Sequence, residues 1–222
     1  MYQAYRWRKS FERRKFFCVA VFATCFFSLL FAQQTKAQSK LQQFRQATRP
    51  VKCWVMAHPF IAKKTFRISQ RALVLADSIR TTSTLDGNWN GGQVDAFRHG
   101  IWMAMLVQEI PERKARKLGQ AYEKGNYLMF KQGKLEDGAM QDARSSQMDL
   151  LNNDAGIAVG LSKEMTADEL VKAVVEAVLA GKFQKIYTTK SGEMLNCEGI
   201  ILKEADWKGK WENSRCIVPS DH

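Results

Sequence analysis

The side chains best suited to chemistry gather in three short segments. In the first, Asp95, Arg98 and His99 lie within the run DAFRH. A spacing of four puts Asp95 and His99 on one helix face, where a carboxylate can fix the imidazole tautomer and prepare the ring as a general base or metal ligand. Taken alone, the pair is explained more simply by an aspartate in the first helical turn, favoured by the helix dipole, and a semi-buried, hydrogen-bonded histidine.

The second and third segments are the dipeptide Tyr122-Glu123 and the run MDLLNNDAG. A glutamate near a helix end is usually solvated, so the dipeptide means little by itself. In the third segment Asp149, Asn152 and Asn153 fall at positions i, i+3 and i+4 of a predicted helix. Asparagine is unfavourable inside helices, so we expect tertiary contacts to hold both asparagines. A helix C-terminus would explain Asn153 but not Asp149.

Together the segments resemble a widespread bacterial domain of unknown function with the motifs D-A-[FY]-R-H-x-x-W, then His-Glu, then M-D-x-x-N-N-x-x-G. The resemblance covers roughly residues 58–160. Such domains occur in secreted proteins and at the toxic C-terminal ends of some long secreted bacterial proteins. This chain has Tyr122 where the family pattern has histidine. The change alters or removes activity if that histidine is a ligand or base, whereas tyrosine can replace a histidine that only packs.

The resembled family has no established reaction, so the type of chemistry has to be inferred from the side chains themselves. In a metal-free hydrolase, His99 oriented by Asp95 or Asp149 would activate water, and Arg98 would stabilise an anionic transition state. In a metal-dependent one, His99, Glu123 and Asp149 would bind a divalent cation. Either version suits hydrolysis of a phosphodiester or an ester. Three further polar side chains would support these groups: Tyr122, Asn152 and Asn153.

A non-catalytic role is the competing hypothesis. The same residues could form a buried polar network that fixes helix packing in an exported binding or structural module, provided that each member is hydrogen-bonded. Tyr122 favours this hypothesis for the present chain relative to its lookalikes. The sequence contains no P-loop, dinucleotide fingerprint, H-E-x-x-H or G-x-S-x-G motif, so the commonest nucleotide, zinc-protease and serine-hydrolase sites are not indicated.

Apolar periodicity predicts a mainly α fold, a compact domain of about five helices. The helices are expected at residues 59–80, 94–108, 111–125, 138–153 and 166–180. Residues 125–137 are predicted to be a loop, and Gly156 and Gly160 to mark the end of the fourth helix. A capping box of Thr166 and Glu169 starts the fifth.

A small β-hairpin is expected near the C-terminus, where 185–189 and 199–202 flank Lys190-Ser191-Gly192. The predicted organisation has four parts. They are a signal peptide (1–37), a polar leader (38–57), the helical domain that carries the motifs (58–182) and a C-terminal appendage with the hairpin and a disulfide (183–222).

The N-terminal segment explains half of the chain's charge. The 222 residues contain 34 Lys and Arg against 22 Asp and Glu, a net charge of +12, and half of this excess lies within residues 1–37. There a basic stretch precedes an apolar run of 17 residues, 16–32, and small residues follow, which is the layout of a secretory signal peptide. Export to the periplasm or medium after cleavage is therefore expected, with an N-terminal membrane anchor as the alternative.

The remaining charge permits an anionic substrate, such as nucleic acid or phospholipid, without requiring one. Export also bears on the cysteines, because an oxidising compartment favours disulfides. Cys197 and Cys216, which close a short loop, are the first choice of pair, and Cys53 paired with either is the alternative.

Overall fold

The computed structural model describes residues 42–136 and 138–222, so the predicted signal peptide lies outside the described residues. The chain divides into a unit of residues 1–47 and a larger unit, Thr48–His222, that contains all three chemically capable segments. In the described part of the chain, no helix is both long enough and apolar enough to cross a membrane.

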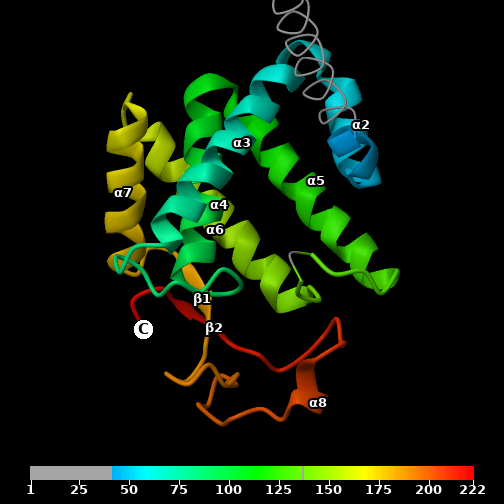
Figure 1. Ribbon diagram of the computed structural model, residues 1–222, viewed down its shortest axis with the longest axis vertical. Helices are drawn as coiled ribbons and strands as arrows, with labels where there is room; N and C mark the ends of the chain where they lie inside the picture. Colours follow the sequence, from blue (N-terminus) through cyan, green and yellow to red (C-terminus); the bar gives the residue numbers. More distant parts are fainter. Residues whose placement is uncertain (1–41, 137) are drawn as a thin grey trace, which may run out of the picture. The chain divides into compact units, whose positions relative to one another are not determined.

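The larger unit is mainly helical with a small two-stranded sheet, as predicted (Figure 1). Its elements, in chain order, are α2 (Arg49–Ala57), α3 (Pro59–Arg80), α4 (Gln93–Glu109), α5 (Glu112–Lys131), α6 (Ala143–Leu161), α7 (Ala167–Leu179), β1 (Gln184–Ile186), α8 (Glu204–Trp207) and β2 (Ile217–Pro219). The predicted start of the fifth helix is confirmed, because Thr166 and Glu169 form the expected capping box at α7.

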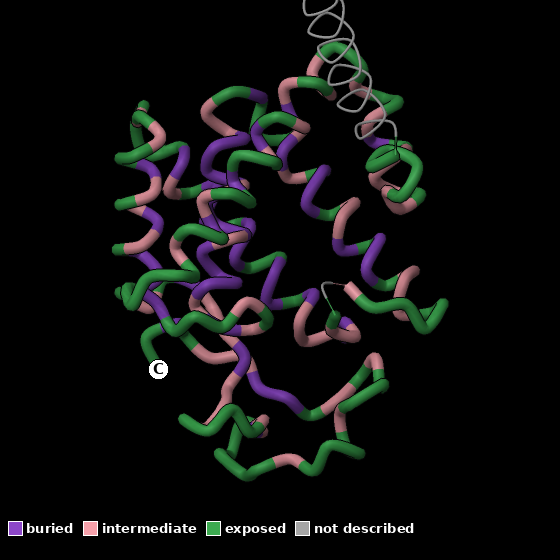
Figure 2. The backbone as a smooth tube through the Cα atoms, in the orientation of Figure 1, coloured by how far each residue is buried: buried purple, intermediate pink, exposed green. Residues whose placement is uncertain are grey.

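Helix α4 lies at the centre of the core and packs against α3, α5, α6 and α7. Figure 2 shows buried residues along its length, and Phe97, Ile101 and Leu106 have no exposed surface. A helix that is apolar on most of its circumference is normally a core helix. Two polar residues of α4, Asp95 and His99, are buried in this core.

The close packing of α4 on α6 corrects one prediction. Gly156 and Gly160 do not end the fourth helix but lie inside α6, which continues to Leu161. A Cβ atom on Gly156 would lie 2.4 Å from the carbonyl oxygen of Gly100, and one on Gly160 would lie 2.6 Å from that of Ala104. These glycines are therefore explained by the close approach of two helix backbones.

A close contact at a glycine also explains why the predicted end of the third helix is wrong. Helix α5 does not fray at Gly125 but continues to Lys131, through most of the predicted loop. A Cβ atom on Gly125 would lie 2.2 Å from the hydroxyl oxygen of Thr48. The glycine thus makes room for the residue that precedes α2.

Residues 49–57, which belong to the predicted polar leader 38–57, form α2. This helix packs against α5: Trp54 is 5% exposed, and its indole Nε1 donates a hydrogen bond to the carbonyl oxygen of Lys114 at 3.2 Å. The proline at the start of α2 suits a first helical turn, where its missing N–H costs nothing.

The C-terminal sheet is present but its pairing differs from the predicted hairpin. β1 pairs antiparallel with β2, so that Ile186 lies opposite Ile217, and 199–202 contribute only an isolated bridge between Leu195 and Ile201. The Cys197–Cys216 disulfide is present, as predicted, and Cys53 is an exposed free thiol. The disulfide places β2 beside the chain that follows β1.

Candidate functional site

Two helices bring the central residues together. Asp95 and His99 share one face of α4, and Asp149 and Asn153 share one face of α6, each pair at a spacing of four. Because Gly156 lets the two helix backbones approach closely, these polar faces meet inside the core. Asp95, His99, Asp149 and Asn153 are all less than 5% exposed.

Asp95, His99 and Asp149 form a compact buried group, called here the DHD group. Nε2 of His99 lies 3.4 Å from Oδ1 of Asp149 and 3.6 Å from Oδ1 of Asp95. The three ligand atoms all lie within 4.8 Å of one another. Two ligands of one zinc-like ion, each about 2.1 Å from it, are about 3.0–3.5 Å apart. The group thus has the N and O donors, and nearly the spacing, of a divalent metal site.

Arg98 and the loop before α4 hold Asp95 in place. Oδ1 of Asp95 accepts a hydrogen bond from Nη2 of Arg98 at 2.5 Å, and Oδ2 accepts one from the backbone N–H of Gly91 at 2.7 Å. Burial lowers the pKa of the Arg98 guanidinium, but the charges of Asp95 and Asp149 outweigh it and raise that pKa overall. Arg98 therefore remains a cation beside the group.

Asp149 is the least compensated member. Among the described residues no hydrogen-bond donor reaches its Oδ1. Burial raises the pKa of Asp149 well above its usual range, the charges of Asp95 and Glu123 raise it further, and Arg98 opposes them. A buried carboxylate oxygen without a donor is costly, and either a proton or a cation beside it removes that cost.

Glu123 is a second buried carboxyl, close enough to influence Asp149 but outside the DHD group. Its Oε2 accepts a hydrogen bond from Nδ2 of Asn126 at 3.2 Å. Burial, together with the charge of Glu136, raises the pKa of Glu123 to about 8, although this amide and the nearby Ser146 hydroxyl both lower it. In the structure Asp95, rather than Glu123, completes the set of three possible ligands.

All of these residues fall within a stretch that matches a known family model. The model is described as a domain of unknown function, DUF6973, and it matches residues 52–182. The chain belongs to this family. No curated protein and no solved structure matches the chain.

In the DUF6973 domain the three predicted supporting residues have different surroundings. Asn152 faces β1, where its Nδ2 donates to the carbonyl oxygen of Gln184 at 3.0 Å and its Oδ1 accepts from the Gln184 N–H at 2.7 Å. Tyr122 packs edge-on against Trp102, with ring centroids 5.6 Å apart. The third, Asn153, is in the site: its Oδ1 lies 3.2 Å from Nδ1 of His99.

A mostly apolar cavity of about 300 Å³ lies beside the DHD group. Arg98, His99 and Trp102 of α4 form part of its wall, and the rest comes from α2, α3 and α5. Among its lining residues are Val55, Ala62, Phe66, Leu73, Trp102 and Tyr122. His99 therefore borders a cavity of the size at which small-molecule sites begin.

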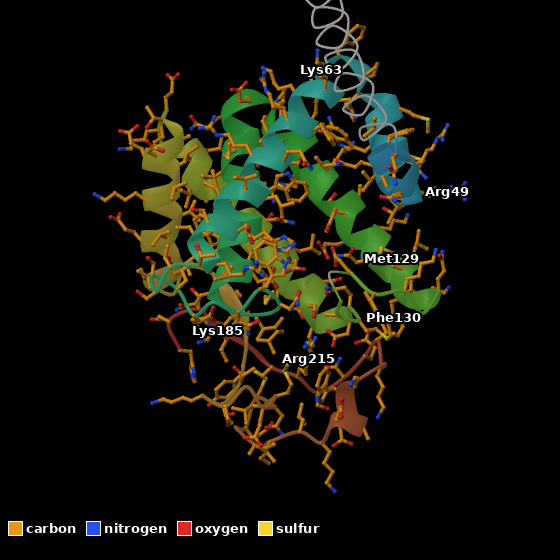
Figure 3. All side chains as sticks on the ribbon, viewed as in Figure 1. Arg49, Lys63, Met129, Phe130, Lys185 and Arg215 are labelled. Atoms are coloured by element: carbon orange, nitrogen blue, oxygen red, sulfur yellow. A yellow bond between two sulfur atoms is a disulfide. The ribbon has the colours of Figure 1, made fainter. Side chains whose placement is uncertain are left out.

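A second, more polar cavity of about 430 Å³ borders Asp95. Basic side chains of the C-terminal segment line it: Lys208, Lys210 and Arg215. Arg215, which is labelled in Figure 3, forms a buried ion pair with Asp142, the N-cap of α6, and donates to the hydroxyl of Ser145 at 2.7 Å. One helical turn of the DUF6973 domain, residues 95–99, thus borders an apolar cavity through His99 and a polar one through Asp95.

The sequence did not indicate these cavities or the support that Gly91 gives Asp95. Gly91 contributes only a backbone N–H, which residue type does not reveal. Ala62 and Leu73 look like ordinary core positions of an amphipathic helix. A usable signal was the four-residue spacing of Gly156 and Gly160, because paired small residues on one helix face permit a close helix contact.

Proposed function

We propose that this DUF6973 domain is a hydrolase that binds a divalent cation at Asp95, His99 and Asp149 and uses it to activate water. The observation that carries the proposal is the convergence of three buried ligand atoms within 4.8 Å, one of them an Asp149 oxygen that no donor reaches among the described residues. Three protein ligands leave coordination positions for water, as in catalytic rather than structural metal sites.

Each residue has a chemical role in this proposal. A bound divalent cation would lower the pKa of a coordinated water and supply hydroxide at neutral pH. Arg98 is a cation held at the same turn by Asp95, and it would stabilise negative charge that develops on the substrate. Asn153 would orient the His99 ring through Nδ1, so that Nε2 faces the cation. The reaction class is hydrolysis of an ester bond.

The place of action is also a proposal. We infer export, with residues 1–37 as the signal peptide, and the Cys197–Cys216 disulfide agrees with folding in an oxidising compartment. The absence of a membrane-crossing helix among the described residues is compatible with this proposal.

Metal titration of the full chain tests the proposal. After chelator treatment, we expect Mn²⁺ or Zn²⁺ to bind with a 1:1 stoichiometry and to raise the unfolding temperature. Asp149→Asn should abolish the effect, and Asp77→Asn, an exposed aspartate on α3, should leave it unchanged. Hydrolysis of a panel of chromogenic esters should follow metal occupancy. An unchanged unfolding temperature with every divalent ion, together with no ester hydrolysis, would favour the packing-network hypothesis.

A further inference from the structure

We infer that the substrate is an acyl ester whose apolar acyl chain lies in the cavity beside His99, with its polar alcohol part on the Asp95 side. The hydrolysis step of this inference rests on the proposed function. The binding of the acyl chain is inferred from the cavity alone and does not depend on catalysis. Three observations carry it: the composition of the cavity wall, the position of Arg98 and His99 in that wall, and the polar cavity across the same helical turn.

The cavity wall offers a ligand mainly apolar surface. Its apolar side chains come from four helices, and two of its polar groups satisfy each other within the protein. The hydroxyl of Ser69 accepts a hydrogen bond from Nε1 of Trp102 at 2.8 Å and donates one to the carbonyl oxygen of Thr65 at 3.0 Å. An anionic polymer such as nucleic acid would lose its hydration here without compensation, whereas an alkyl chain gains by leaving water.

Two polar groups in this wall suit the ester end of such a ligand. The guanidinium of Arg98 is a cation with 14% of its side chain exposed, and it can donate to a carbonyl oxygen or to the carboxylate product. His99 belongs to the DHD group and also borders the cavity. An acyl chain held in the cavity therefore brings its carbonyl carbon to the side of the proposed metal site.

We place the alcohol part of the substrate in the second, more polar cavity. Asp95 and Asp142 border it, as do the basic residues Lys208, Lys210 and Arg215, of which Arg215 is paired with Asp142. An ester bond between an apolar acyl group and a polar alcohol would thus lie at the turn that separates the two cavities. In the reaction, the oxygen of water bonds to the acyl carbon and the bond between that carbon and the alcohol oxygen breaks. One water proton passes to the alcohol, and the other leaves with the carboxylic acid.

Equilibrium binding of saturated fatty acids to the full chain tests the cavity without requiring catalysis. We expect affinity to rise about fourfold for each added methylene until the cavity is filled, because burial of one methylene contributes about 0.8 kcal/mol. Affinity that does not change with chain length would overturn the inference. This series uses the unaltered protein, so it does not depend on whether any variant folds.

Two matched variants locate the bound chain. Ala62→Trp fills the cavity from α3 and should weaken fatty-acid binding about tenfold or more. Ala173→Trp is the control, since Ala173 is a similarly half-buried alanine on α7 outside the cavity. Equal affinities in a folded Ala62→Trp variant and the unaltered protein would also overturn the inference. Fatty-acid binding without any ester hydrolysis would instead contradict the proposed function alone, and metal-dependent hydrolysis without chain-length dependence would contradict only this inference.

Discussion

Oδ1 of Asn153 lies 3.2 Å from Nδ1 of His99, which leaves Nε2 as the ring nitrogen that faces Asp95 and Asp149. If the amide oxygen of Asn153 is the acceptor, Nδ1 carries the proton, and a neutral ring then directs its Nε2 lone pair toward two carboxyl groups. Lone pairs that face one another repel unless a proton or a cation lies between them. The orientation of His99 is therefore part of the argument for a cation site.

The two neighbouring asparagines of α6 should have different roles: Asn153 should affect metal affinity, and Asn152 should affect folding stability. Asn153→Ala should weaken divalent-metal affinity about 10- to 100-fold, the usual effect of removing a group that orients a metal-binding histidine. Asn152→Ala should leave metal affinity unchanged but lower the free energy of unfolding by about 1–3 kcal/mol, because it removes both hydrogen bonds to the Gln184 backbone. Metal titration and denaturant unfolding of both variants check this, and equal effects on affinity would contradict it.

The raised pKa of Glu123 predicts a pH dependence of stability. Between the unfolded value of about 4.3 and the folded value of about 8, the folded state holds a proton that the unfolded state has released. Stability should therefore fall as pH rises through this window, with a slope approaching 1.4 kcal/mol per pH unit for this group (about one proton), and then level off.

Glu123→Gln removes the titrating group while keeping an acceptor for Asn126. The variant should lose most of this slope and be more stable than the unaltered protein at pH 8. Denaturant unfolding across the pH range, with chelator present, measures both effects. A matched Glu176→Gln change, at an exposed position on α7, should leave the slope as it was. Parallel curves for Glu123→Gln and the unaltered protein would show that Glu123 is not the responsible group.

The sequence predicted the helical class and selected His99, Asp95 and Asp149, which the structure brings together, because residue type and four-residue spacing are local properties. It could not predict that Asn152 faces β1 while Asn153 faces His99, since adjacent residues on a helix differ by about 100° and only packing decides which face is which. The boundaries at Gly125, Gly156 and Gly160 were wrong for a related reason. A helix-ending glycine and a helix-contact glycine are the same residue type, and the distinction lies in what a Cβ atom would touch.

Tyr122 occupies the position where the resembled family pattern has histidine, and its location predicts a limited effect on metal binding. It packs against Trp102 in the wall of the apolar cavity, whereas the three members of the DHD group come from α4 and α6. Tyr122→His should therefore change metal affinity by less than about tenfold, whereas removal of an Asp149 ligand atom should abolish binding. Metal titration of both variants compares them directly. A large gain of affinity in Tyr122→His would mean that position 122 supplies a ligand after all.

Gly156 sets the distance between α4 and α6 and so the geometry of the DHD group. Gly156→Ala places a Cβ atom against the Gly100 backbone, which cannot move aside as a side chain can, so we expect a loss of about 1–3 kcal/mol in unfolding free energy. Alanine's better helix propensity, about 1 kcal/mol, offsets part of the strain. Ala158→Ser, at an exposed position of α6, should change stability by less than about 0.5 kcal/mol. Equal stability of the two variants would contradict the close-contact argument.

The Cys197–Cys216 disulfide should stabilise the C-terminal segment, which contributes Lys208, Lys210 and Arg215 to the second cavity. The two cysteines are 19 positions apart. Closing a loop of this length lowers the conformational entropy of the unfolded chain and so stabilises the folded protein by about 3 kcal/mol. Cys216→Ser should therefore lower the free energy of unfolding by about that amount, as should a reducing agent added to the unaltered protein. Cys53→Ser is the matched control, because Cys53 is an exposed free thiol, and it should change little. A loss of stability in Cys53→Ser as large as that in Cys216→Ser would contradict the Cys197–Cys216 pairing, because Cys53 would then contribute to a disulfide.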